Sequence, residues 1–153
     1  MKLYYSPASP FARKCRVVIR EKGLLARVEE VSVDLFGGDL GKVQAINPSG
    51  QVPALIDEAG IVWTDSPLIC ARLDAMSGAP YLVPEGEARW NVLRREAIAD
   101  GAMEQGVKYR LESVRPESER SPSWMARWLA GVRRSIDAAE AAGLSFAELQ
   151  SRT

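Results

Sequence analysis

Apolar positions follow two different periods along the first part of the chain. A short apolar run at residues 3–5, stopped by a serine and a proline, predicts a strand. Over residues 10–22 the apolar positions recur at helical spacing. This predicts a helix with Ser9 as its N-cap, Pro10 at its first position and Gly23 at its end. The side chains expected to face inward are Phe11, Cys15, Val18 and Ile19.

The following segments alternate between the patterns of strands and helices. We expect, in order, a strand at residues 28–33, a short helix at 39–46, strands at 52–57 and 61–63 joined by a hairpin turn, and a helix at 66–76. Ser66 is the expected N-cap of that helix, whose expected apolar face consists of Leu68, Ile69, Leu73 and Met76. The order β-α-β-α-β-β-α predicts a small mixed sheet with helices on its faces.

The pattern changes beyond residue 77. Prolines and glycines mark residues 78–86 as a linker, and the apolar period is helical from there on. One long helix is expected from about residue 90 and a second from about residue 123, with a loop at 115–122. The expected inward positions include Trp90, Leu93, Ala97, Ile98, Trp124, Trp128, Leu129, Val132 and Ile136.

These patterns predict an α/β domain over residues 1–77, a linker over 78–86 and an all-helical domain over 87–153. Near the end of the chain, Gly143 is the expected stop of the second long helix. The run Ser145-Phe146-Ala147-Glu148 then has the pattern of a capping box and predicts the start of a third helix.

Composition narrows the possible chemistry. The chain has 153 residues with 20 Lys+Arg and 20 Asp+Glu, and this even balance argues against a nucleic-acid-binding protein. Histidine is absent, which excludes a histidine general base and histidine metal ligands. The two cysteines, Cys15 and Cys70, are too few for a disulfide framework or a four-cysteine zinc site. We therefore expect reduced core thiols and no metal.

The subcellular location is predicted from the lengths of the apolar runs in the chain. No stretch approaches the roughly 20 apolar residues that span a bilayer. The N-terminus lacks the long apolar core of a signal peptide. We therefore expect a cytoplasmic protein that makes no contact with a membrane.

Three motifs carry a resemblance to a known family. They are Tyr5-Ser6-Pro7-Ala8-Ser9-Pro10-Phe11, Asn47-Pro48-Ser49-Gly50-Gln51-Val52-Pro53-Ala54-Leu55 and Thr64-Asp65-Ser66-Pro67. In this order and at this spacing they resemble the glutathione S-transferase family. The resemblance implies a thioredoxin-like N-terminal domain followed by an all-helical domain. That helical domain normally continues well past the capping box, so the chain is expected to carry a shortened version of it.

The resemblance to the serine-type members implies that Ser9 activates the thiol of glutathione. Attack on an electrophile needs the thiolate, and a free thiol has a pKa of about 8.5. A hydroxyl hydrogen bond to the sulfur at a helix N-terminus lowers such a pKa by roughly one to two units. Judged by its position alone, Ser9 is simply an N-cap, and the two roles are compatible. Ser6 and Tyr5 are the alternative activating residues.

The other two motifs are expected to bind the tripeptide. A cis bond before Pro53 would let the backbone of Val52 pair with the cysteinyl part of glutathione, with Gln51 beside it. Asp65 is expected to pair with the γ-glutamyl amine. Ser66 and the start of its helix are expected to bind the γ-glutamyl carboxylate. Each of these residues also has a plain structural role, as a strand-initial proline or a helix cap.

Five further positions have weaker support as site residues. Lys42 is either a ligand of the glycyl carboxylate or a solvated lysine. Asp100 resembles an aspartate that reaches across a dimer in some family members, or it is an ordinary helix-face residue. Phe11, Tyr109 and Trp124 either line an electrophile pocket or belong to the core.

Two functions follow from this interpretation. The first is a glutathione transferase that acts in detoxification as a homodimer, with glutathione as co-substrate and a small electrophile of unspecified identity. The second is a non-catalytic glutathione transferase-like module that binds partners, which the expected shortening of the helical domain favours. Retention of the thiol-site residues favours the enzyme.

Overall fold

The computed structural model describes residues 1–141. Contacts divide the chain into two compact units, Met1–Val83 and a second unit that begins at Pro84. Gly143 and the capping-box run 145–148 lie outside the described residues, so the predicted third helix stays a prediction.

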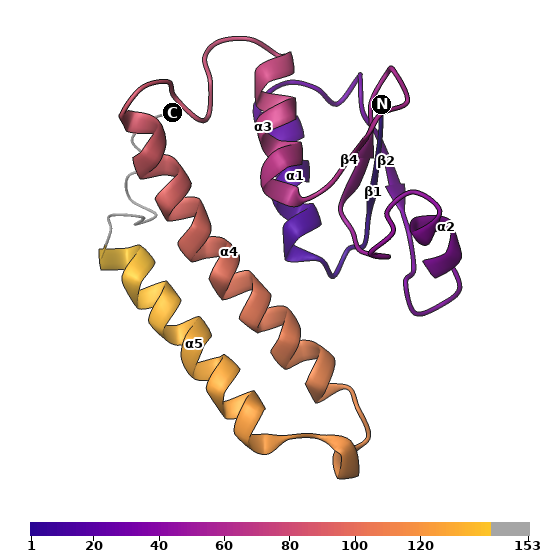
Figure 1. The fold of residues 1–153 in the computed structure, drawn as a ribbon, viewed down its shortest axis with the longest axis vertical. Coiled ribbons are helices and arrows are strands. Elements are labelled where there is room, and N and C mark those ends of the chain that lie inside the picture. Colours follow the sequence, from indigo (N-terminus) through magenta and orange to yellow (C-terminus); the bar gives the residue numbers. More distant parts are fainter. Residues whose placement is uncertain (142–153) are drawn as a thin grey trace. The chain divides into compact units, whose positions relative to one another are not determined.

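The first unit has the predicted element order β-α-β-α-β-β-α (Figure 1). This confirms the thioredoxin-like arrangement expected for it. Its elements are β1 (Lys2–Tyr5), α1 (Pro10–Glu21), β2 (Glu29–Ser32), α2 (Leu40–Gln44), β3 (Ala54–Ile56), β4 (Val62–Trp63) and α3 (Ser66–Met76).

The four strands form one mixed sheet in the order β2-β1-β3-β4. Strand β1 pairs in parallel with β2 and antiparallel with β3, and β3 pairs antiparallel with β4. Helices α1 and α3 cover one face of this sheet, and α2 lies on its other side (Figure 1). A sheet covered in this way buries apolar side chains between its strands and its helices.

The core of this unit lies between the sheet and the helix pair α1–α3. Leu3, Leu55, Ile19, Ile69 and Leu73 are fully buried there. Cys15, Leu24 and Val28 complete the cluster. The expected inward position of Leu68 is wrong, because 49% of its surface is exposed. Leu68 precedes buried Ile69, and adjacent positions on a helix point in directions about 100° apart.

Two carboxylates secure the turns of the first unit. Asp57 accepts hydrogen bonds from the backbone of Ala59 and Ile61, both at 2.9 Å, and from the indole of Trp63. Asp74 accepts hydrogen bonds from the backbone of Leu82 and Val83 and pairs with Lys22 at 2.9 Å. These contacts tie the β3–β4 hairpin together and hold the segment that follows α3.

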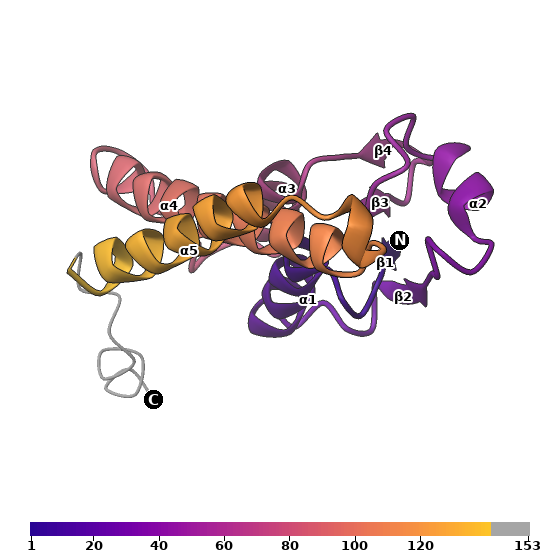
Figure 2. The same ribbon diagram turned by 90° about the horizontal axis from the view of Figure 1, so that it is seen from below.

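The second unit is helical, as predicted. It contains α4 (Ala88–Ser113), a short 3-10 helix (Glu117–Glu119) and α5 (Pro122–Ala141). Helices α4 and α5 pack lengthwise against each other (Figure 2). The expected inward placement of Trp90, Trp124 and Ile136 is wrong, because these side chains are 61%, 50% and 49% exposed. Two helices share a single seam, which is too narrow to bury every position of an apolar stripe.

Candidate functional site

Strand register brings the three sequence motifs to one edge of the sheet. Tyr4, near the end of β1, pairs with Ala54, the first residue of β3. Trp63, the last residue of β4, pairs with Leu55. The segment after β1, the segment before β3 and the segment after β4 therefore all leave the sheet at this edge. These are the segments that carry Ser9, Val52–Pro53 and Asp65–Ser66.

Ser9 is the N-cap of α1, as predicted. Its Oγ accepts a hydrogen bond from the backbone N–H of Ala12 at 3.2 Å, and Pro10 occupies the first helical position. A hydroxyl that accepts one hydrogen bond still has its own proton to donate. Ser9 is half-buried, so part of its surface is exposed. Capping and thiol activation are thus chemically compatible at this residue.

The alternative activating residues have different surroundings. The backbone carbonyl of Ser6 accepts a hydrogen bond from the N–H of Ser9 at 3.0 Å, which fixes the tight turn before α1. The ring of Tyr5 lies under the guanidinium of Arg16, with 4.2 Å from the Arg16 carbon to the ring centroid. This cation–π contact gives Tyr5 a structural role of its own.

The turn before β3 is held by its own polar groups. The side-chain amide of Asn47 donates to the carbonyl of Gln51 at 2.9 Å, and its oxygen accepts from the N–H of Ser49. Gly50 has a φ of 65°, a conformation that favours glycine. The Val52–Pro53 peptide bond is cis, which confirms that expectation.

The start of α3 departs from the prediction in one respect. Asp65 is the N-cap, and its carboxylate accepts a hydrogen bond from the N–H of Ser66. Ser66 is the first helical residue, so its expected role as the cap is wrong. Its side chain is fully buried, and its Oγ has no hydrogen-bond partner within residues 1–141. A buried hydroxyl without a partner is costly, and a ligand that bonds to it removes that cost.

The remaining expected site residues are spread over several elements. Lys42 lies on α2, is exposed, and pairs with Asp39 at 2.6 Å. That hydrogen bond raises the pKa of Lys42 above its ordinary value. Gln51 is exposed, and Phe11 is half-buried in the first turn of α1. Asp100 is half-buried on α4 and belongs to the second unit.

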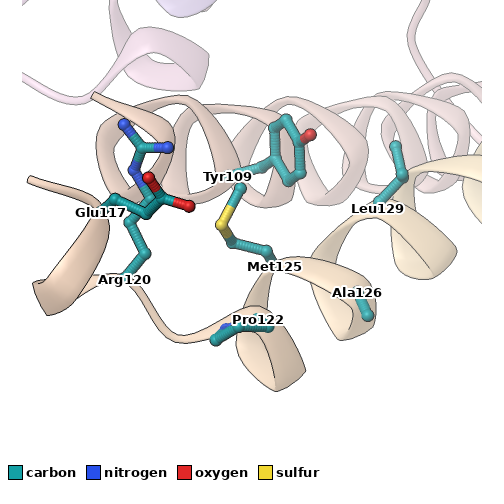
Figure 3. A pocket seen from close by; sticks show the side chains of 7 residues that line it. All are labelled: Tyr109, Glu117, Arg120, Pro122, Met125, Ala126 and Leu129. Atoms are coloured by element: carbon teal, nitrogen blue, oxygen red, sulfur yellow. The ribbon is translucent and has the colours of Figure 1, made fainter. Parts of the chain in front are cut away.

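The helical unit contains a hollow of about 380 Å³ between α4 and α5 (Figure 3). Tyr109 from α4 and Met125 and Leu129 from α5 line it, and Glu117 and Arg120 provide charged groups. Trp124 instead stacks on Trp128, with 5.6 Å between the ring centroids. Of the two helical aromatics considered for an electrophile pocket, Tyr109 is therefore the one that lines a hollow.

One pair of residues was missed by sequence reasoning. Cys15 is a buried core residue, as expected, but its Sγ lies only 3.7 Å from the Sγ of Cys70. The two residues are 55 positions apart in the chain. The sequence indicated only that both cysteines are core residues on their helices. Periodicity alone does not say which helices are neighbours.

Two features are absent from residues 1–141. No group of three or more metal-binding side chains lies close enough together to hold a metal ion in this part of the chain. None of its helices is both long and apolar enough to cross a membrane.

Comparison with known proteins agrees with this architecture. The family model for the N-terminal domain of glutathione S-transferases matches residues 3–87. A relative in Escherichia coli K12, described as the uncharacterized GST-like protein YibF, is 36% identical over 141 residues. That match covers 92% of this chain and 68% of the relative.

Solved structures extend the likeness beyond the N-terminal unit. A glutathione transferase family member from Pseudomonas fluorescens Pf-5 with bound glutathione is 34% identical, with a TM-score of 0.88 over 98% of this chain and 74% of that chain. The same protein with bound S-(propanoic acid)-glutathione matches with 34% identity and a TM-score of 0.80, over 92% of this chain and 69% of that chain. Together with the matching family model, these likenesses show that the chain belongs to the glutathione S-transferase family.

Proposed function

We propose that this protein binds glutathione at the sheet edge where its three motifs meet. In this proposal the hydroxyl of Ser66 and the first N–H groups of α3 bind the γ-glutamyl carboxylate, because a helix N-terminus favours an anion. Asp65 has a second carboxylate oxygen with which to pair with the γ-glutamyl amine. The observation that supports this assignment best is the buried Oγ of Ser66, which has no hydrogen-bond partner among the described residues 1–141.

The backbone before β3 completes the proposed binding site. Val52 offers its backbone N–H and C=O to the cysteinyl residue of glutathione, in the manner of an added strand. Gln51 is exposed beside it and contributes a side-chain contact. Lys42 takes the glycyl carboxylate, and it would leave Asp39 to do so. We propose residues 1–77 as the glutathione-binding domain, residues 78–86 as a linker and residues 87–153 as the region of a helical domain.

Ser9 is the proposed activating residue. Its hydroxyl donates to the glutathione sulfur while its oxygen continues to accept from Ala12. The thiolate then attacks a small electrophile and forms a thioether. A relative in complex with S-(propanoic acid)-glutathione supports conjugation of this kind. Phe11, in the first turn of α1, is proposed to contact the electrophile.

Assembly and location complete the proposal. We propose a cytoplasmic homodimer that acts in detoxification, in which Asp100 of one copy reaches the γ-glutamyl group bound by the other. The absence of turnover in a protein that binds glutathione would instead support the non-catalytic module.

The Ser66→Ala variant tests the binding site. Because Oγ has no partner within residues 1–141 of the free protein, its removal should leave the free energy of unfolding unchanged or slightly raised. Loss of a hydrogen bond to a carboxylate should weaken glutathione binding about tenfold, measured by calorimetry. A loss of stability with unchanged affinity would mean that the hydroxyl has only a structural role.

Ser9 variants test thiol activation separately from helix capping. Ser9→Gly removes the hydroxyl but costs the cap only a few tenths of a kcal/mol. It should lower the conjugation rate at neutral pH at least tenfold and reduce the thiolate absorbance of the complex. Ser9→Thr keeps the hydroxyl and the cap, so it is the matched control and should retain most of the rate. A full rate in Ser9→Gly would assign activation elsewhere, and Ser6→Ala and Tyr5→Phe would be measured next.

A further inference from the structure

Two thiols from separate helices are in contact inside the N-terminal unit. Cys15 belongs to α1 and Cys70 to α3, and both are free cysteines. The Cys70 thiol donates to the Sγ of Cys15 over 3.7 Å, and the Cys15 thiol donates to the backbone carbonyl of Ser66 over 3.7 Å. A short chain of hydrogen bonds therefore connects the thiol pair to the first residue of α3.

We propose that Cys15 and Cys70 form a reversible disulfide, which cross-links α1 to α3 when the protein meets a low-molecular-weight disulfide such as glutathione disulfide. The sulfur atoms of a disulfide lie about 2.05 Å apart. The two Sγ atoms start from 3.7 Å, so the bond requires them to close the gap by side-chain rotation and a small helix adjustment.

The unequal burial of the thiols sets the order of events. Cys70 is half-buried whereas Cys15 is fully buried, so a reagent reaches Cys70 more readily than Cys15. The neighbouring Cys70 thiol and the burial of Cys15 raise the pKa of Cys15 above its ordinary value. The thiolate is the nucleophile in disulfide exchange, so Cys70 reacts first and Cys15 second.

The chemistry balances in two exchange steps. In the first, the Cys70 thiolate attacks one sulfur of glutathione disulfide, the S–S bond breaks, and one glutathione thiolate leaves and takes up a proton. In the second, the Cys15 sulfur loses its proton and attacks the Cys70 sulfur of the mixed disulfide, and a second glutathione leaves and is protonated. Two protein thiols are oxidised and one glutathione disulfide is reduced to two glutathione molecules.

Oxidation changes the hydrogen bonding at the start of α3. Once its sulfur is in a disulfide, Cys15 has no proton to donate to the carbonyl of Ser66. Ser66 is also the proposed ligand of the γ-glutamyl carboxylate, so the effect of oxidation on glutathione binding rests on the proposed function. A lost S–H hydrogen bond at that position should weaken glutathione affinity about two- to fivefold.

The disulfide is tested on the full chain without reference to activity. The reduced protein is incubated with excess glutathione disulfide, quenched with an alkylating reagent, digested without reductant and mapped by mass spectrometry. We expect a peptide pair that joins Cys15 to Cys70, the loss of both alkylation sites, and their recovery after dithiothreitol. A stable glutathione adduct on Cys70 alone, disulfide-linked dimers, or two alkylated thiols would overturn the proposal.

Single variants check the order of the steps. Cys15→Ala should stop the reaction at one glutathione adduct on Cys70. Cys70→Ala should leave Cys15 unmodified while the protein is folded, because Cys15 is buried. Modification of Cys15 in the folded Cys70→Ala protein would contradict the proposed order. Circular dichroism establishes that each variant is folded, and the wild-type map decides the proposal if a variant is not.

Calorimetry with reduced and oxidised wild-type protein then separates the two hypotheses, with S-methylglutathione as the ligand because it has no free thiol to reduce the disulfide. If the disulfide forms but neither form of the protein binds glutathione, the proposed function is contradicted and the proposed cross-link is supported. Equal affinity in both forms would refute the coupling between the thiol pair and the site. Weaker binding by the oxidised form, restored by dithiothreitol, would support the coupling.

Discussion

The two units of this chain bury their side chains to very different extents. In the first unit, five large apolar side chains are fully buried between the sheet and the helices α1 and α3: Leu3, Ile19, Leu55, Ile69 and Leu73. In the described part of the second unit, Gly131 is the only buried residue, and α4 has none. Helix α4 is nevertheless the longest described element, with 26 residues.

This difference shows that a segment can form regular secondary structure without enclosing a hydrophobic core. A sheet with helices on it encloses side chains from several directions, whereas a helix pair encloses only its seam. The motifs of the proposed glutathione site all lie in the unit that has the core. Sites of this kind need side chains held within fractions of an ångström, and a packed scaffold provides that rigidity.

The largest effect should come from the buried ion pair of the first unit. The side chains of Lys22 and Asp74 are 6% and 5% exposed. Burial opposes the ionisation of Asp74, but the N–H groups of Leu82 and Val83 and the Lys22 ammonium lower its pKa below the ordinary value. Asp74→Ala leaves the lysine charge unpaired and should cost about 3–5 kcal/mol in urea unfolding.

An exposed pair provides the control for Asp74→Ala. Arg27 and Glu58 also pair at 2.9 Å, but their side chains are 45% and 58% exposed. Glu58→Ala should therefore cost less than about 1 kcal/mol. Similar losses in the two variants would contradict the view that burial decides the contribution of an ion pair here.

The next largest effect should come from truncating apolar side chains. It tests directly whether the first unit buries its side chains more than the second. Leu55→Ala removes a fully buried side chain from the sheet and should cost about 2–5 kcal/mol. Leu111 on α4 is 46% exposed, so the matched Leu111→Ala variant should cost under about 1 kcal/mol. Both values come from the midpoint and slope of urea unfolding. A larger loss at Leu111 would show that the helical unit packs against something in solution that covers α4.

The smallest effect should be the acid sensitivity of the first unit. Hydrogen bonds from Arg20, and then from Arg16, lower the pKa of Glu30 from 4.5 to about 2, although burial opposes this. A carboxyl with a lowered folded-state pKa stabilises the protein above its unfolded-state pKa, and this stability is lost as the pH falls through the folded-state value. Stability should therefore decline between about pH 4.5 and pH 2.

Glu30→Gln isolates this contribution. The variant should lose about 1 kcal/mol at pH 7, because Arg16 and Arg20 are partly solvated. Its stability should then fall less steeply than that of the wild type over the acid range, measured by urea unfolding at a series of pH values. Identical slopes would mean that other carboxyls, such as Asp57 and Asp74, account for the acid response.

Local sequence was sufficient for most of the element order and for the position of the candidate site. Ser9 and Pro10 predict the start of α1 because capping and a proline at the first position act within one helical turn. The turn at residues 47–53 is recognisable because it requires particular residues, such as Gly50 with its positive φ. Each of these features depends on neighbours within a few positions along the chain.

Tertiary structure decided which distant side chains meet. The thiols of Cys15 and Cys70 come into contact only because α1 packs on α3, and Lys22 reaches Asp74 for the same reason. Asp65, and not Ser66 as expected, caps α3. The hydroxyl of Ser66 is instead buried, without a partner in the described part of the chain. Periodicity determines which face of a helix is apolar, but the shape of the neighbouring surface determines which of those residues are enclosed. That is why the sequence predicted Leu68 and Trp90 to face inward, whereas only the packing showed that both are exposed.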